Sequence, residues 1–282
     1  MDRLDHPSGA APLGTPVNAC PSEMTRRRFF APPGAFTLNH SSVTLAPDEA
    51  RHLREVLRLK VGDEVYVFDG AGHEFHCRIA ESGRDIAELE VVSEISPAKP
   101  ESPLLITLAV ALLKGEKFDL VVQKATELGV ASVVPLVTKH ADIRLRDASD
   151  AAKRVARWQR IALEGSKQSG RAVVPEVRSP VVFKSLIETQ KQHTTDSEVV
   201  SQGLMFSERD GASFDEWCKS NQVGPSALTA LIGSEGGWAD EEIALARSAG
   251  WSIITLGGRT MRAETAAIAV SALLQHRFGD LS

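Results

Sequence analysis

Residues 228–265 read LTALIGSEGGWADEEIALARSAGWSIITLGGRTMRAET, and this stretch contains the pattern that decides the fold. The apolar run Leu228–Ile232 predicts a buried strand, because it is short and ends at a glycine. The glycine-rich break Gly233–Gly237 follows, and such a backbone can pass close to a ligand. A helix comes next, with Asp240 as its predicted N-cap and Gly250 just past its end.

The same arrangement then repeats. Trp251–Leu256 is predicted as a second buried strand, Gly257-Gly258 as a second break and Arg262–Phe278 as an alanine-rich helix. Glycine turns at the same ends of neighbouring strands lie where open α/β sheets bind ligands. Two ordinary turns could share this spacing, but they do not require the polar strings S-E-G-G-W and R-T-M-R-A-E-T. The stretch therefore predicts an α/β domain with a ligand site at the two breaks.

Length and composition are those of a soluble globular protein. The chain has 282 residues, of which 43% are hydrophobic and 24% charged, so it can hold one large or two modest domains. Its most apolar run, residues 104–113, is too short to span a membrane. The three cysteines are scattered without a CxxC and the histidines lack metal-ligand spacing, so the sequence predicts no disulfide framework, no metal site and a reduced, cytoplasmic setting.

Charge is unevenly distributed along the chain. The formal net charge is −5, which argues against wholesale binding of polyanions. Residues 139–178, however, contain ten Lys or Arg against five Asp or Glu, and three arginines stand together at 26–28. These basic residues could form a nucleic-acid footprint or simply a solvated helix face.

The first third of the chain divides into three parts. Residues 1–24 are rich in Pro, Gly and Ala without periodicity, which predicts a disordered extension rather than a signal peptide. Residues 25–97 contain a helix over Glu49–Leu57 and several short strand-like segments, with a hairpin signal at Asp69-Gly70, and predict a small β-barrel. Residues 98–103, AKPESP, predict a linker.

Residues 104–282 predict a second, larger domain. A strand over 104–112, a helix over Glu116–Leu128 with one apolar face, and a strand over Val130–Val137 make a βαβ unit. Such a unit implies a parallel sheet covered by helices. The rest of the pattern predicts a basic helix, a polar surface loop and a further strand, at Ala151–Gln168, 188–202 and Leu204–Phe206.

Several common catalytic motifs are absent from the sequence. No GxGxxG follows a predicted strand, so a dinucleotide-binding fold is disfavoured. The chain contains no GxxxxGK[ST], no HExxH and no GxSxG, which leaves P-loop, zinc-peptidase and nucleophile-elbow chemistry without support.

Six motifs together resemble one known family. In chain order they are R-R-F-F at 27–30, H-L-R-E-V-L-R-L-K-V-G-D at 52–63, K-G-E-K-F-D-L-V-V-Q-K-A-T-E-L-G-V at 114–130, Q-S-G-R at 168–171, L-I-G-S-E-G-G-W at 231–238 and L-G-G-R-T-M-R-A-E-T-A at 256–266. They resemble the RsmE family, the ribosomal small-subunit RNA uridine-N3 methyltransferases of the SPOUT superfamily. The chain departs from the family at Ser234, usually proline, and at Thr260-Met261, usually Ile-Leu.

The resemblance implies a fold, a cofactor and an assembly. SPOUT domains bind S-adenosylmethionine (SAM) in a carboxy-terminal trefoil knot and are typically homodimers, and the amino-terminal domain resembles a PUA-like RNA-binding barrel. Carried over by position, the cofactor-binding residues are Leu231, Ile232, Gly233, Glu235, Gly236, Gly237, Leu256, Gly257, Met261, Arg262 and Thr265. Glu235 is expected to face the ribose hydroxyls or the cation of the cofactor, or else only to cap a turn.

The implied reaction suggests roles for two residues of the second motif. Uridine N3 loses an imide proton when it is methylated, so a base and a group that stabilises the anion are expected. We expect Arg262 to stabilise negative charge on a uracil oxygen, and Glu264 to assist proton removal or to orient Arg262. The alternative is a local ion pair that fixes the start of the helix.

Arg27, Arg28 and Arg171 are predicted to contact RNA phosphates, with an exposed tail and a dimer-interface bridge as the alternatives. The expected substrate is small-subunit ribosomal RNA within an assembled subunit, because a modest net charge offers few non-specific phosphate contacts. No membrane partner is expected.

Two other function classes stay open at this level. A non-catalytic RNA-binding or ribosome-assembly factor could keep the same fold, although the intact glycine turns and the R-A-E-T string argue against loss of the site. A nucleotide-binding enzyme of another kind, such as an NAD-dependent one, is disfavoured by the missing GxGxxG.

Overall fold

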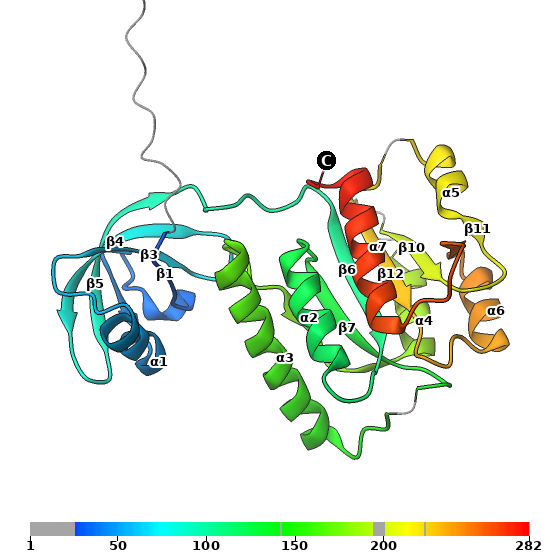
Figure 1. Cartoon of the computed structure of the whole chain (residues 1–282), viewed down its shortest axis with the longest axis horizontal. Coiled ribbons are helices and arrows are strands. Elements are labelled where there is room, and N and C mark those ends of the chain that lie inside the picture. Colours follow the sequence, from blue (N-terminus) through cyan, green and yellow to red (C-terminus); the bar gives the residue numbers. More distant parts are fainter. Residues whose placement is uncertain (1–25, 142, 194–200, 223, 282) are drawn as a thin grey trace, which may run out of the picture.

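The computed structural model describes residues 26–141, 143–193, 201–222 and 224–281. The predicted extension, residues 1–24, lies outside the described residues. Figure 1 shows a smaller, β-rich amino-terminal domain beside a larger α/β domain, with an extended segment joining them.

The amino-terminal domain is one curled sheet of five strands. Its order is β1-β3-β4-β5-β2, so β1 and β2 form the edges, and the β1–β3 pair is parallel while the others are antiparallel. Alternating side chains such as Val65 and Val67 are buried in its core. The strands are β1 (Arg28–Phe30), β2 (Ser42–Leu45), β3 (Glu64–Phe68), β4 (Glu74–Ser82) and β5 (Ala87–Ile95).

The helix and the hairpin of this domain lie where the sequence predicts them. Helix α1 (Pro47–Arg51) begins at a proline, which suits a first helical position, and continues as the π-helical turn η2 (His52–Val56). A short 3-10 turn, η1 (Pro33–Ala35), precedes β2. Strands β3 and β4 form the hairpin, in which Gly70 has φ +79° and Asp69 Oδ1 accepts a hydrogen bond from the backbone N–H of Ala71 at 2.7 Å.

The larger domain is built on a parallel sheet, which confirms the prediction from the βαβ pattern. Its order is β11-β13-β10-β12-β6-β7-β8, with β9 paired to β7, and each strand pair within it is parallel, as expected for a SPOUT domain. The trefoil knot stays a prediction. The strands are β6 (Leu105–Ala111), β7 (Ser132–Val137), β8 (Glu176–Val177), β9 (Val181–Val182), β10 (Gln202–Phe206), β11 (Ala212–Ser213), β12 (Ala227–Ile232) and β13 (Ser252–Thr255).

Helices cover both faces of the sheet (Figure 1). One apolar core lies under α2 (Lys117–Glu127), α3 (Ala148–Ser169), α5 (Phe214–Ser220) and α7 (Ala263–Phe278). The other lies under α4 (Phe183–His193) and α6 (Asp240–Ser248). Because strand β12 is buried on both faces, its sequence is a nearly continuous apolar run. None of the helices within the described ranges has the length and apolarity needed to cross a bilayer.

Two local predictions were wrong. The loop expected over 188–202 is helical up to His193, because α4 continues that far; residues 194–200 lie outside the described part. Helix α6 has Ala239, not Asp240, at its N-cap, and the buried carboxylate of Glu242 accepts the hydrogen bond of the Ala239 N–H at 3.0 Å. Asp240 instead pairs with Arg209, at 2.7 Å between Oδ1 and Nη1.

Buried ion pairs join the two domains. Glu74 of β4 is 0% exposed and accepts hydrogen bonds from Arg26 and Arg28. Arg28 also donates to three backbone carbonyls at the end of α3 and beyond it, Ser166, Lys167 and Arg171. Lys167 pairs with Glu49 of the amino-terminal domain. Burial by itself lowers the pKa of Lys167, but the carboxylates of Glu49 and Glu164 outweigh it, so the pKa is raised.

Candidate functional site

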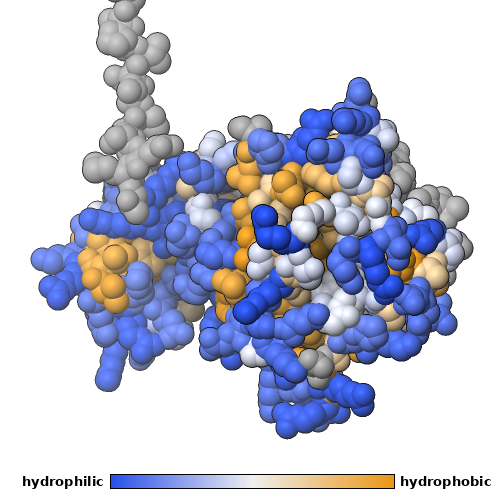
Figure 2. All heavy atoms as spheres, turned by 45° about the vertical axis from the view of Figure 1, so that its right-hand side comes forward, coloured by the Kyte–Doolittle hydropathy of each residue, from blue (hydrophilic) through white to orange (hydrophobic). Residues whose placement is uncertain are grey.

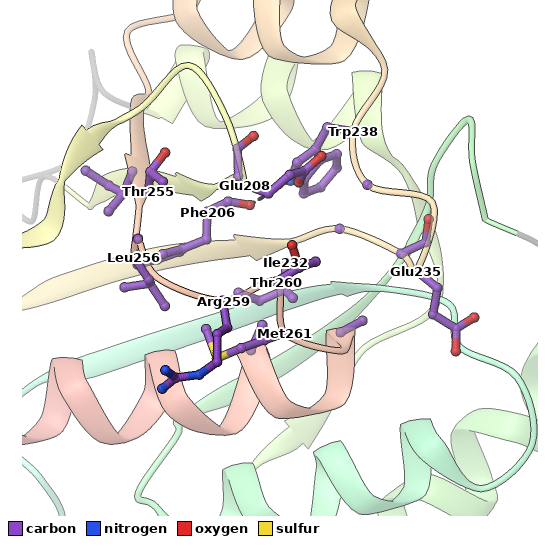
Figure 3. Close-up of a pocket in the computed structure, with 18 of the residues that line it drawn as sticks. Phe206, Glu208, Ile232, Glu235, Trp238, Thr255, Leu256, Arg259, Thr260 and Met261 are labelled. Carbon is purple, nitrogen blue, oxygen red and sulfur yellow. Dashed lines mark hydrogen bonds between the residues drawn. The ribbon is translucent and has the colours of Figure 1, made fainter.

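A cavity of about 400 Å³ lies at the carboxyl ends of three adjacent strands, β10, β12 and β13. This is the edge at which a parallel sheet exposes its loops to ligands. Figure 3 shows that side chains from all three strand ends surround the cavity, with α7 below it. Its lining residues are Phe206, Ser207, Glu208, Ile232, Gly233, Ser234, Glu235, Gly236, Gly237, Trp238, Ile254, Thr255, Leu256, Gly257, Gly258, Arg259, Thr260, Met261, Ala263 and Ala266.

The loop after β12 needs its glycines. A Cβ at Gly237 would lie 2.7 Å from Glu208 Oε1, and Gly237 has a φ of +68° that disfavours other residues. A Cβ at Gly233 would lie 3.1 Å from Nε1 of Trp238. That nitrogen donates a hydrogen bond to the carbonyl of Phe206 at 2.8 Å, so the buried indole fastens the loop to the end of β10.

The outer side of this loop is tied to two other elements. Ser234 Oγ donates to the carbonyl of His140 at 3.0 Å, and His140 Nδ1 lies 3.2 Å from the carbonyl oxygen of Gly236. Glu235 pairs with Lys117 at the start of α2, and Figure 3 shows its carboxylate pointing away from Phe206 and Leu256. Ser234, at a position where proline was expected, thus holds the loop by a side-chain hydrogen bond.

The loop after β13 is determined by backbone conformation. Gly257 and Gly258 have φ of +73° and +72°, and a Cβ at either would meet no atom within 4 Å. Glycine is therefore required here for its left-handed conformation rather than for lack of space. Just before them, Thr255 Oγ1 is buried and has no hydrogen-bond partner among the described residues. That oxygen faces Gly211, where an added Cβ would lie 2.6 Å from it.

The start of α7 closes the cavity. Arg262 is the N-cap residue of α7 and is exposed, as is Thr265 in the first turn. Glu264 is 8% exposed, and its Oε2 has no hydrogen-bond partner in the part of the chain that the structure describes. Burial of a carboxylate oxygen without a partner is costly, although the amino-terminal end of a helix favours negative charge.

Most of the residues predicted from the two glycine motifs surround this cavity. Ile232, Gly233, Glu235, Gly236, Gly237, Leu256, Gly257 and Met261 line it. Leu231, Arg262 and Thr265 do not. Leu231 is buried in the core on the opposite face of the sheet from Ile232, because successive side chains of a strand alternate.

Sequence reasoning missed the contribution of β10 and several further side chains. Phe206, Ser207 and Glu208 belong to the third strand end, and the only sequence signal was a short apolar segment followed by polar residues. Its relevance depends on β10 lying between β12 and β13, which the sequence does not specify. The other missed side chains are Ser234, Trp238, Ile254, Thr255, Arg259, Thr260, Ala263 and Ala266.

The arginines predicted to contact RNA have different surroundings. Arg27 is exposed. The Arg28 side chain is 7% exposed and pairs with Glu74, and that of Arg171 is 6% exposed and pairs with Glu101 while donating to two backbone carbonyls. Arg28 and Arg171 therefore hold the domains and the linker together, and their donors face protein acceptors instead of solvent.

No group of side chains suited to a metal ion occurs among the residues that the structure describes. Lys139 Nζ donates a hydrogen bond to Glu241 at the start of α6, and this contact lowers the pKa of the Glu241 carboxyl group.

Comparison with protein families gives two matches. A family model described as an RNA methyltransferase domain matches residues 100–275, and a second, described as an RNA methyltransferase PUA domain, matches residues 45–92. The first covers the sheet, the cavity and most of α7.

Individual proteins give the same picture. The chain is 33% identical to ribosomal RNA small subunit methyltransferase E of Synechocystis over 227 residues, covering 80% of this chain and 70% of that protein. It is 29% identical to the Bacillus subtilis protein of the same name, and the match covers 82% of this chain and 88% of that protein. A crystal structure of a ribosomal RNA small subunit methyltransferase E from Neisseria gonorrhoeae, bound to SAM, superposes with a TM-score of 0.76 at 31% identity, covering 91% of this chain and all of that one.

Proposed function

The chain belongs to the RNA methyltransferase family, and from this premise we propose that it transfers the methyl group of SAM to N3 of a uridine in small-subunit ribosomal RNA. The observation that carries the proposal is the cavity at the ends of β10, β12 and β13, walled by two glycine loops. The similar Neisseria gonorrhoeae structure contains SAM, and the relatives from Synechocystis and Bacillus subtilis are named as methyltransferases of small-subunit ribosomal RNA.

The cavity fits a molecule such as SAM in size and chemistry. Its volume of about 400 Å³ lies within the ~300–1,000 Å³ range of small-molecule sites. Ile232, Leu256 and Met261 offer apolar surface for the adenine ring. Glu208 places a carboxylate at the wall, where it can accept hydrogen bonds from ribose hydroxyls or balance a positive charge. Bound SAM supplies an electrophilic methyl group.

The protein's main task in this reaction is positioning. Methyl transfer requires the acceptor nitrogen in line with the bond that breaks, so a rigid pocket lowers the barrier through proximity and orientation. The hydrogen bonds of Trp238 and Ser234 fix the first loop, and the two left-handed glycines shape the second. Uridine N3 lies on the Watson–Crick edge, so the target base must be unpaired or flipped out.

We propose that two arginines stabilise the negative charge that develops on the uracil oxygens. Arg262 at the head of α7 is exposed, as is Arg259, and Arg259 also lines the cavity. We assign the larger share of this charge stabilisation to Arg259, because it depends on a donor directed at the reacting group.

We assign removal of the imide proton to Glu264. Its Oε2 is buried and lacks a partner among the described residues, so it keeps a free acceptor for the imide proton once the head of α7 admits the base or a bridging water. Glu264 lies in the first turn of α7, next to the lining residue Ala263.

The assembly proposed for the active protein is a homodimer in the cytoplasm, where ribosomal subunits occur. It is supported by α7, whose outward side also carries apolar residues, Ile268, Ala269 and Leu273, the last 38% exposed. Figure 2 shows that hydrophobic residues gather in patches on an otherwise hydrophilic surface, as expected where a partner binds.

The deciding experiment combines labelled SAM with small ribosomal subunits from a strain that lacks this protein, followed by nucleoside analysis. Label in N3-methyluridine at one position is the expected result. Label in a different nucleoside would contradict the uridine-N3 assignment. Tight SAM binding without any transfer would contradict catalysis and favour an assembly factor.

A further inference from the structure

The loop after β10 contributes one wall of the cavity and contains an arginine that does not line it. Arg209 directly follows the lining residue Glu208 but lies outside the cavity. Its guanidinium reaches the loop after β12, where Nη2 donates to the carbonyl of Trp238 at 3.0 Å and Nη1 pairs with Asp240 Oδ1 at 2.7 Å. Arg209 therefore joins the two loops from behind the cavity wall.

A second hydrogen bond joins the same two loops in the opposite direction. Trp238 Nε1 donates to the carbonyl of Phe206 at 2.8 Å, and the indole is 1% exposed. Trp238 thus accepts from Arg209 through its backbone and donates to Phe206 through its side chain. Glu208 lies between these two attachment points. A short segment that is fixed on both sides of a residue leaves its backbone little freedom, so the direction of the Glu208 side chain is set by these contacts.

The Glu208 carboxylate itself is left available to a ligand. Its Oε1 lies 3.9 Å from Arg209 Nε, which is too long for a hydrogen bond, and no residue within the described ranges donates one to this carboxylate. The same oxygen packs against Gly237, where an added Cβ would lie 2.7 Å away. Figure 3 shows Glu208 and Trp238 on the same side of the cavity.

An arginine is suited to this task by its shape. The planar guanidinium carries several N–H donors in a rigid fork, whereas a lysine ammonium is a compact point charge on a flexible stem. Asp240 fixes one nitrogen of Arg209, which leaves another directed at the Trp238 carbonyl. This contact also gives a use to the Asp240 carboxylate, which does not cap α6.

We propose that Arg209 is a positioning residue of the SAM site. By joining the loops after β10 and β12, it holds the Glu208 carboxylate at the cavity wall, where bound SAM contacts it. Arg209 itself touches no ligand and acts through Glu208. This assignment rests on the proposed function in one respect, the occupation of the cavity by SAM.

The test is a double-mutant cycle on SAM affinity, measured by calorimetry without RNA. Arg209→Ala and Glu208→Gln are each expected to weaken SAM binding about 10-fold. The double variant should bind as weakly as Glu208→Gln alone, by about 10-fold rather than ~100-fold, because Arg209 acts through Glu208. In methyl-transfer assays Arg209→Ala should raise the KM for SAM and leave kcat at saturating SAM unchanged, since the lost contact is a binding contact.

Two further variants separate position from charge and from stability. Arg178→Ala removes an arginine of similar exposure, 50% against 45%, which is paired with Glu176 at the far edge of the sheet from β10. It should bind SAM as the wild type does and unfold at about the same urea concentration as Arg209→Ala, because each variant loses one exposed ion pair. Arg209→Lys keeps the charge but not the fork and should recover little of the lost affinity.

Three results would overturn the proposal. Additive losses in the double variant would mean that Arg209 acts independently of Glu208. Wild-type SAM affinity in Arg209→Lys would show that a positive charge suffices without the fork. A urea midpoint lowered in Arg209→Ala but not in Arg178→Ala would assign Arg209 to stability alone. A wild-type protein that binds SAM but methylates no uridine would contradict the proposed function and leave the calorimetric cycle intact.

Discussion

At the scale of single residues, the loop after β13 carries the two arginines on which catalysis is proposed to depend. Arg259 lines the cavity, whereas Arg262 caps α7 just outside it. Both are exposed cations on one short loop, so their removal should change the overall charge equally. A difference in activity between the Arg259 and Arg262 variants therefore reflects where each arginine lies relative to the cavity.

Replacing each arginine by alanine is expected to lower kcat by about 100-fold for Arg259→Ala and about 10-fold for Arg262→Ala, because a donor aimed at the developing anion contributes most. The affinity for SAM, measured by calorimetry, should stay near the wild-type value. Arg247→Ala, on α6, is the control and should leave kcat unchanged. A larger loss of kcat for Arg262→Ala than for Arg259→Ala would contradict this assignment, and Arg262, the residue predicted from the sequence, would then be the main group that stabilises the negative charge.

At the scale of elements, the glycine loop after β12 determines the shape of the cavity. Its tip is fixed by Trp238, Ser234 and the tight approach of Gly237 to Glu208. A side chain at Gly237 would meet a conformational cost and a collision, whereas Gly250, at the end of α6, has φ +85° and no atom within 4 Å of an added Cβ.

Gly237→Ala and Gly250→Ala should each destabilise the protein by about 1–2 kcal/mol, the usual cost of a left-handed alanine. Only Gly237→Ala is expected to weaken SAM binding, because its Cβ displaces Glu208 at the cavity wall. Urea denaturation and SAM titration of both variants provide the comparison. Equal SAM affinities would show that this loop does not shape the binding site.

At the scale of the whole molecule, buried charges fix the arrangement of the two domains. The buried carboxylate of Glu74 accepts hydrogen bonds from Arg26, Arg28 and the backbone N–H of Ala98. A buried pair is expensive to break, because the remaining partner is left buried and unpaired.

Glu74→Gln is expected to lower the free energy of unfolding by about 3 kcal/mol, since it leaves Arg28 without its counter-charge. Glu94→Gln, which removes an exposed partner of His73, should change it by less than ~1 kcal/mol. Urea denaturation of both variants measures the difference. A small effect at Glu74 would mean that the junction depends on packing rather than on charge.

The proposed homodimer can be tested on the outward side of α7. Leu273→Lys places a charge in that apolar surface and should convert a dimer to a monomer in sedimentation experiments. Val92→Lys, at an exposed apolar position of β5, is the control and should leave the mass unchanged. A wild-type protein that sediments as a monomer would contradict the proposal.

Much of the fold follows from the sequence because the pattern and the structure obey the same local rules. Strand β12 is a short apolar run that ends in glycine, and α2 has one apolar face, so both were predicted within one or two residues. Helix α4 was not predicted, and its polar residues 188–193 were assigned to a loop because they resemble one when only composition is considered. The N-cap of α6 was misplaced because Glu242, three residues on, supplies the capping carboxylate.

For the candidate site, the sequence by itself determined the residues whose backbone conformation is special. Glycines such as Gly237 and Gly257 are needed locally, whatever surrounds them. Only the tertiary structure decided that β10 lies between β12 and β13, which brings Glu208 to the cavity, and that Arg28 and Arg171 face carboxylates inside the molecule. The physical reason is that strand order and charge pairing depend on residues far apart in the chain, whereas turn conformation depends on neighbours.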